Sequence, residues 1–165
     1  MSEFPSVSSS SAPVYRYAAV VSTYHREYCD AMLLSAQREL REHTLDVVRV
    51  PGAFEIPLAV LRLAKTGGYD GILAFGVVWT GKTQHAGEIL RACTDALMKI
   101  TLDYNVPVFH EILSVNNEKD VRARTTGRLN RGIEASRAAL ELSESLRAAG
   151  LHVERRAWNP QTAES

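Results

Sequence analysis

Gly71-Ile72-Leu73-Ala74-Phe75-Gly76-Val77-Val78 is the stretch of this 165-residue sequence that decides its fold. Its residues are almost all apolar, so no polar face is left for solvent. Strands with this composition are buried on both faces, and they occur mainly in parallel sheets that helices cover on each side. Residues 71–78 therefore predict the central strand of an α/β domain.

Three further β-rich runs, Tyr15–Ser22, Leu45–Val50 and Val106–Leu113, complete the strand pattern. Apolar residues between and after them recur three or four positions apart, as on one face of a helix. The helical segments are marked by Cys29, Met32, Leu33, Ala36 and Leu40; by Phe54 to Ala64; by Ile89, Ala92, Cys93, Ala96, Leu97 and Ile100; and by Ala135, Ala138, Ala139, Leu142 and Leu146. Alternating strands and helices predict right-handed crossovers. We expect one doubly wound, flavodoxin-like domain, with a four-stranded parallel sheet and helices on both faces.

The domain is expected to span residues 14–150, because Gly150 is placed to end the last helix. Residues 1–13 are rich in Ser and Pro and predict a flexible N-terminal arm. Residues 151–165 predict a loosely held C-terminal tail. The polar stretch after the fourth strand is expected to be irregular.

The composition excludes several functional classes. Lys plus Arg and Asp plus Glu number 19 each, so charge favours neither nucleic acid nor an anionic membrane surface. The sequence has no apolar run of the roughly 20 residues that a membrane span needs, and its N-terminus does not resemble a signal peptide. We therefore expect a cytoplasmic protein. Cys29 and Cys93 fall on apolar helix faces, which favours buried free thiols over a disulfide or a metal site.

Ligands of doubly wound folds bind beyond the carboxyl ends of the strands, where the strand order reverses. Four segments of this sequence lie there: Thr23–His25, Pro51–Glu55, Val78–His85 and Ser114–Arg124. They hold no Cys, His, Asp and Glu cluster with metal-ligand spacing, so no metal is expected.

The third of these segments ends in Gly81-Lys82-Thr83-Gln84-His85 at the start of a helix. Unpaired helix amides, the helix dipole and Lys82 would together form a phosphate cradle. An ordinary turn with a solvated lysine explains the same residues, because the glycine pattern of a Walker A loop is missing. The dipole disfavours protonation of His85, which suits a proton acceptor, although a surface or capping role fits as well.

The other segments supply groups that suit a heterocyclic, sugar-like ligand. Tyr24 can stack on a ring, or it is a partly buried core tyrosine. Glu55 lies in a run fixed by two prolines and a glycine, where it can accept hydrogen bonds from hydroxyls or offset a helix dipole. Trp79 fits a core or subunit contact better than a ligand platform. Arginines that suit phosphate crowd the fourth segment, although charged loops are usually just solvated: Arg122, Arg124, Arg128 and Arg131.

The same residues resemble the lumazine synthase family in their order and spacing. The matching runs are Tyr24-His25, Val50 to Pro57 (VPGAFEIP), Gly76 to His85 (GVVWTGKTQH), Val106 to Val108 and Asn130-Arg131-Gly132. The similarity extends over roughly Tyr15 to Leu146. The second and third runs together are specific, whereas either one alone would be weak.

The resemblance implies a role for each matching residue. Tyr24 would stack on the pyrimidinedione substrate, and His85 would carry the proton. Residues lining the pyrimidinedione and ribityl pocket would be Ala53, Phe54, Glu55, Val77, Val78, Trp79 and, in place of the usual phenylalanine, His110. Phosphate ligands would be Gly81, Lys82, Thr83 and Arg124, with Arg122 as the alternative to Arg124.

The implied reaction condenses 5-amino-6-(D-ribitylamino)uracil with 3,4-dihydroxy-2-butanone 4-phosphate in riboflavin biosynthesis, without a cofactor. The product would be 6,7-dimethyl-8-ribityllumazine. The resemblance also implies a pentamer, or a 60-subunit shell of pentamers, with active sites between subunits. The alternative is a non-catalytic flavin- or lumazine-binding scaffold with the same fold. It is motivated by departures from the family pattern: Thr80, Ala86, Gly87, His110, Glu111 and Arg131.

Overall fold

A computed structural model describes residues 11–81 and 84–157 of the chain. Its four strands are β1 (Arg16–Ser22), β2 (Thr44–Val50), β3 (Gly71–Trp79) and β4 (Val108–Val115). All pairings are parallel and the strand order is β2-β1-β3-β4. This arrangement confirms the predicted doubly wound α/β fold with a four-stranded parallel sheet.

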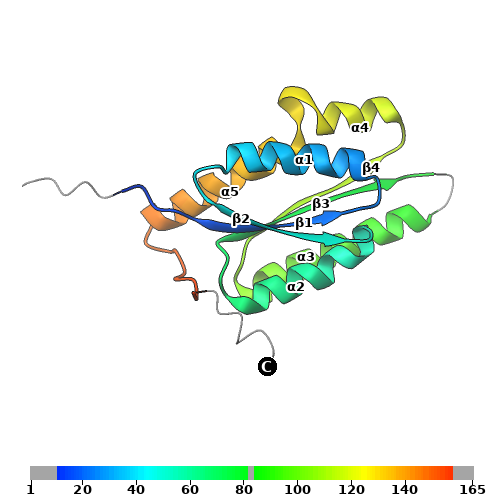
Figure 1. Ribbon diagram of the computed structural model, residues 1–165. Helices are drawn as coiled ribbons and strands as arrows, with labels where there is room; N and C mark the ends of the chain where they lie inside the picture. Colours follow the sequence, from blue (N-terminus) through cyan, green and yellow to red (C-terminus); the bar gives the residue numbers. More distant parts are fainter. Residues whose placement is uncertain (1–10, 82–83, 158–165) are drawn as a thin grey trace, which may run out of the picture.

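Helices cover both faces of the sheet (Figure 1). Helices α1 (Arg26–Glu39) and α5 (Arg131–Ala148) pack on one face, and α2 (Ile56–Thr66) and α3 (His85–Tyr104) pack on the other. Alternate residues of β1 point into two separate cores, with Tyr17 on the α1 and α5 side and Val20 on the α2 and α3 side. Every residue of β3 from Gly71 to Val78 is buried, as the apolar run predicted.

Both cysteines are buried free thiols, as expected from their helix faces.

The boundaries of two elements differ slightly from those predicted. The chain begins its second helical segment with a 3₁₀ turn, η1 (Ala53–Glu55), before α2. The fourth strand runs from Val108 to Val115, two residues later than expected.

The expectation of an irregular stretch after β4 was wrong. Helix α4 (Glu118–Thr125) and a 3₁₀ turn, η2 (Gly127–Leu129), occupy it. Asn117 caps α4 by accepting a hydrogen bond from the Asp120 backbone amide at 2.8 Å. The helix buries only Val121 and Thr125, so it lacks the apolar stripe by which a helix is recognised.

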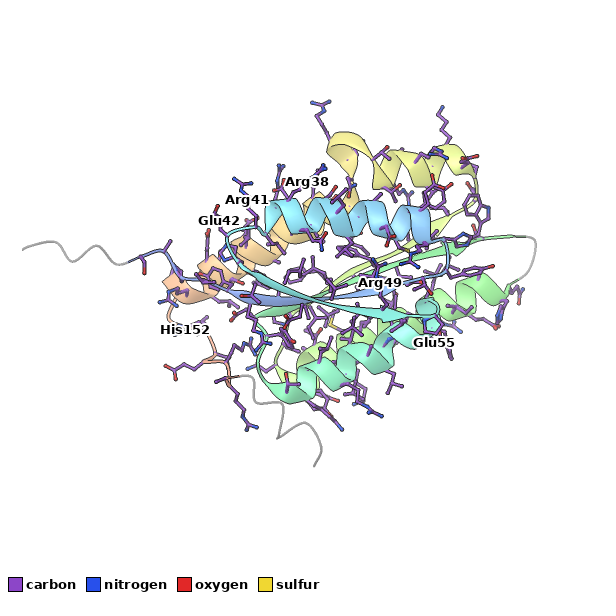
Figure 2. The ribbon with its side chains drawn as sticks, viewed as in Figure 1. Arg38, Arg41, Glu42, Arg49, Glu55 and His152 are labelled. Carbon is purple, nitrogen blue, oxygen red and sulfur yellow. The ribbon has the colours of Figure 1, made fainter. Side chains whose placement is uncertain are left out.

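The segment after α5 contacts the amino ends of the strands. The Arg156 amide donates to the Gly67 carbonyl at 2.9 Å, and the Arg155 guanidinium lies 3.5 Å from the Asp70 carboxylate. These two contacts join the described part of the expected tail, residues 151–157, to the residues that precede β3. Figure 2 shows His152 of this segment at the end of the molecule opposite to Glu55. Residues 1–10 of the expected arm and residues 158–165 of the expected tail lie outside the described residues.

Candidate active site

A cleft of about 460 Å³ lies at the carboxyl ends of the strands, where the order reverses between β1 and β3. This is the position that the fold predicts for a ligand. Its lining comes from the segments after β1 and β2, the end of β3 and the start of α3: Tyr24, His25, Gly52, Ala53, Phe54, Glu55, Val77, Val78, Trp79, His85, Ala86 and Ile89. The structure thus brings together eight of the residues that the sequence suggested: Tyr24, Ala53, Phe54, Glu55, Val77, Val78, Trp79 and His85.

Backbone hydrogen bonds tie the segments after β1 and β2 to each other. The Thr23 amide donates to the Val50 carbonyl at 2.8 Å, and the Tyr24 amide donates to the Pro51 carbonyl at 3.1 Å. Tyr24 is 67% exposed at the mouth of the cleft. Its ring is therefore free to stack on a planar ligand.

Glu55, labelled in Figure 2, is the last residue of the η1 turn. Its amide donates to the Gly52 carbonyl at 3.3 Å, and a Cβ at position 52 would lie 3.0 Å from its Oε2. A glycine at 52 lets the carboxylate lie close to the backbone. The Cys93 thiol of α3 donates to the Ala53 carbonyl at 3.4 Å and holds the turn against the helix. The exposed Glu55 carboxylate can therefore accept hydrogen bonds from hydroxyl groups at a defined place.

His25 is a cleft residue that the sequence reasoning missed. Its φ of 53° is in the left-handed region, which turns its ring between Tyr24 and Trp79. The ring centroids lie 4.5 Å from Tyr24 and 5.6 Å from Trp79. Burial lowers the pKa of His25, so its imidazole is neutral at pH 7. Its place beside Tyr24 after the first strand was a usable signal, but the sequence does not show which neighbour faces the cleft.

His85 begins α3, where the first-turn amides have no partner within the helix. Its side chain is exposed and lines the cleft. Gly81 is exposed and is not part of the lining. The suggested phosphate ligands Lys82 and Thr83 lie outside the described residues. Thr80, one of the departures from the family pattern, donates its hydroxyl to the Val115 carbonyl at 3.0 Å and so ties β3 to β4.

His110 is not in the cleft of its own chain. It pairs with Ala74 in the sheet, four residues before Ser114, which pairs with Val78. This spacing corresponds to about 13 Å along the strand. Its Nδ1 accepts from the Ile112 amide at 3.2 Å, so its Nε2 carries the proton and donates to Thr94 Oγ1 at 2.8 Å. Burial lowers the pKa of His110, which keeps this tautomer neutral.

The two candidate arginines of α4 differ in their surroundings, and neither lines the cleft of its own chain. Arg124 Nη1 donates to the Ser114 carbonyl at 3.2 Å, near the carboxyl end of β4, and its Nε lies 3.2 Å from Asp120. Arg122 donates to Glu118 at 2.6 Å and lies 5.7 Å from the centre of the Tyr28 ring. Arg124 is therefore the arginine that contacts β4, whereas Arg122 contacts the start of α1.

Two further observations concern the described residues only. No group of three or more His, Cys, Asp or Glu side chains there is arranged to hold a metal ion. None of the described helices is long and apolar enough to cross a membrane.

A family model described as 6,7-dimethyl-8-ribityllumazine synthase matches residues 14–147. The chain belongs to this family. A protein of Mycobacteroides abscessus named 6,7-dimethyl-8-ribityllumazine synthase is 40% identical over 149 residues, which cover 87% of this chain and 92% of that protein. A protein of the same name from Xanthomonas oryzae pv. oryzae is 37% identical over 136 residues, covering 79% and 88%.

The lumazine synthase match includes all four strands and every residue that lines the cleft. It ends just before the segment 151–157 that contacts the amino ends of the strands. The cleft is thus part of what this chain shares with the family, whereas the contacts of 151–157 lie beyond it.

Proposed function

We propose that this chain catalyses the reaction for which its family is named, the formation of 6,7-dimethyl-8-ribityllumazine. The two substrates are 5-amino-6-(D-ribitylamino)uracil and 3,4-dihydroxy-2-butanone 4-phosphate, and no cofactor takes part. The observation that carries the proposal is one cleft in which an aromatic ring, a carboxylate and a histidine surround the carboxyl ends of β1 and β3. We place the enzyme in the cytoplasm, where buried free thiols such as Cys29 persist.

The cleft residues suit the ring and the ribityl chain. Tyr24 stacks on the pyrimidinedione, and the apolar walls formed by Ala53, Phe54 and Val77 to Trp79 enclose the ring system. Glu55 accepts hydrogen bonds from ribityl hydroxyls. The phosphate of the second substrate binds at the start of α3, through Gly81, Lys82, Thr83 and the helix amides.

His85 is proposed to move protons during the condensation. The 5-amino group attacks the ketone of the second substrate, and loss of water gives an imine. Phosphate then leaves by elimination, and the resulting enol tautomerises to a ketone. The 6-ribitylamino nitrogen attacks this ketone and closes the second ring with loss of another water. His85, at the edge of the cleft, accepts a proton in one step and returns it in another.

The active form is proposed to be a pentamer or a 60-subunit shell with sites between subunits. The cleft is open on one side, where the side chains of Tyr24 and Phe54 are 67% and 63% exposed. Helix α3 also exposes two apolar side chains, Met98 and Leu102. Large exposed apolar side chains indicate a covering surface. His110 lies in the edge strand β4, and Arg124 contacts that strand. Neither residue lines the cleft of its own chain, so each can contribute only to the cleft of a neighbouring subunit. Light scattering that reports a monomer would contradict this assembly.

Turnover with both substrates tests the proposed function directly. Formation of the lumazine is followed by absorbance and compared with the uncatalysed background. Product above background establishes the reaction. No product from a folded assembly would instead favour the non-catalytic scaffold, and a flavin titration of the same sample would show whether it binds that ligand.

Arg124→Ala is expected to raise KM for the phosphate substrate about tenfold or more, with a smaller change in kcat. A charge-assisted hydrogen bond to phosphate contributes about this much to binding. The measurement is steady-state kinetics with the pyrimidinedione held at saturation.

Arg122→Ala is the matched control, because this arginine belongs to the same helix but pairs with Glu118 and Glu27. Its KM should stay within about twofold of the wild-type value, as is usual for exposed ion pairs. An unchanged KM in Arg124→Ala would refute the role of Arg124. A large increase in Arg122→Ala alone would assign the phosphate contact to Arg122.

A further inference from the structure

Glu111 is a carboxylate in an otherwise apolar row of the edge strand β4. The same face of the strand carries three apolar residues. Leu113 and Val115 belong to the core beneath α1 and α5, and Phe109 packs against it. The Glu111 side chain is only 15% exposed. Among residues 11–81 and 84–157 its carboxylate accepts no hydrogen bond, and its only ion-pair partner there is Arg131.

The nearest cation is Arg131, the first residue of α5. Its Nε lies 4.0 Å from the Glu111 carboxylate, just beyond hydrogen-bonding distance. Its Nη1 donates to Glu134 Oε2 at 2.6 Å, and Glu134 is largely exposed. The guanidinium therefore has two competing acceptors, an exposed one that it contacts and a buried one that it almost reaches.

The charge of Glu111 changes near neutral pH. Burial raises its pKa to about 7, with Arg131 acting against this shift and Glu134 adding to it. Among the described residues no other charged group contributes to the shift. His110 points to the opposite face of β4, toward Thr94 of α3. A neutral Glu111 below pH 7 would leave Glu134 as the stronger partner of Arg131, and a charged Glu111 above pH 7 would compete for the same guanidinium.

We propose that Glu111 is a positioning residue, which sets where the Arg131 guanidinium lies along the outer edge of β4. The position of this guanidinium in turn sets the substrate affinity of the active site that the β4 edge completes. The inference rests on the proposed function, because it places this edge against the cleft of a neighbouring subunit. Glu111 itself touches no substrate. Its effect reaches the site through Arg131.

The test is KM for each substrate, and kcat, from pH 6 to pH 8.5 in the wild type and in Glu111→Gln. In the wild type we expect KM for one substrate to change about three- to fivefold with a midpoint near pH 7, a size in line with a partly exposed ion pair. Glu111→Gln should remove this change, because the amide stays neutral at every pH. Glu134→Gln is the matched control, since it removes the charge that Arg131 contacts but keeps the titrating carboxyl of Glu111. It should retain a pH-dependent KM, with a midpoint below that of the wild type because the Glu134 charge no longer raises the pKa of Glu111.

A KM profile in Glu111→Gln that still follows the wild type would overturn the proposal. So would an equal loss of kcat at every pH, since that is the result of a purely structural role. If the wild type makes no product at any pH, the proposed function fails, and crystal structures at pH 5.5 and 8.5 decide on Glu111 alone. Movement of Arg131 into hydrogen-bonding distance of Glu111 at the higher pH supports the proposal, and an unchanged separation overturns it.

Discussion

Gly132→Ala is expected to prevent the chain from accumulating as a folded protein. A Cβ at this position would lie 2.0 Å from the carbonyl oxygen of Met32 and 2.7 Å from its carbonyl carbon. These are backbone atoms of α1, so no rotamer change relieves the clash, and α1 and α5 must separate. We expect a loss of about 4 kcal/mol or more in the free energy of unfolding, out of the roughly 5–15 kcal/mol that a domain has. The measurements are soluble yield and thermal unfolding.

The close contact is anchored by the cap of α5. Asn130 is 3% exposed; its side-chain oxygen accepts from the Gly132 amide at 2.7 Å, and its side-chain nitrogen donates to the Ala31 carbonyl at 3.3 Å. These bonds fix the first turn of α5 against α1, so the helix cannot slide away from an added methyl group without breaking them. The cost of the substitution therefore includes buried hydrogen bonds as well as overpacking.

Gly87→Ala provides the matched control. Gly87 is also in a helix, but a Cβ there would meet no atom within 4 Å. Alanine should leave the stability unchanged or raise it by up to about 1 kcal/mol, because it favours helix. If Gly132→Ala folds with a melting temperature near that of the wild type, the close approach of α1 and α5 is wrong.

The fold could be predicted because its signals are local and agree with one another. The apolar run at 71–78 indicated a strand buried on both faces, and the alternation of strands with helical stripes then left few topologies. Helix α4 was missed because its packing needs only Val121 and Thr125, so its sequence reads as polar. The Asn117 cap three residues before Asp120 was the signal available for it.

The site could be predicted in part, because the carboxyl ends of parallel strands meet at one edge. Tyr24, Glu55 and His85 follow or approach strand ends, and the structure places all three around one cleft. Sequence alone could not select His25, since its orientation depends on a left-handed backbone conformation. Nor could it show that Glu111 lies beside Arg131, because Arg131 is 20 positions further along the chain and helix α4 lies between them.

His85→Ala is expected to lower kcat about 100-fold without abolishing turnover, and to change either KM by much less. A positioned acid–base group typically contributes about 10²–10⁴-fold, and the lower end is expected here because water can reach the exposed site of His85 and replace part of its function. Holding two substrates together can supply roughly 7–11 kcal/mol of the barrier reduction, and this part survives the substitution. The measurement is steady-state lumazine formation at saturating substrates.

Two further variants decide whether His85 is the proton carrier. Gln84→Ala changes the neighbouring residue, which makes no side-chain cap to α3, and should retain wild-type turnover. His25→Ala removes the other cleft histidine, whose lowered pKa leaves it neutral but whose ring lies between Tyr24 and Trp79. It should mainly weaken binding of the pyrimidinedione, because the aromatic wall loses its middle ring. A greater loss of kcat in His25→Ala than in His85→Ala would transfer the proton-carrying role to His25, since both imidazoles line the same cleft.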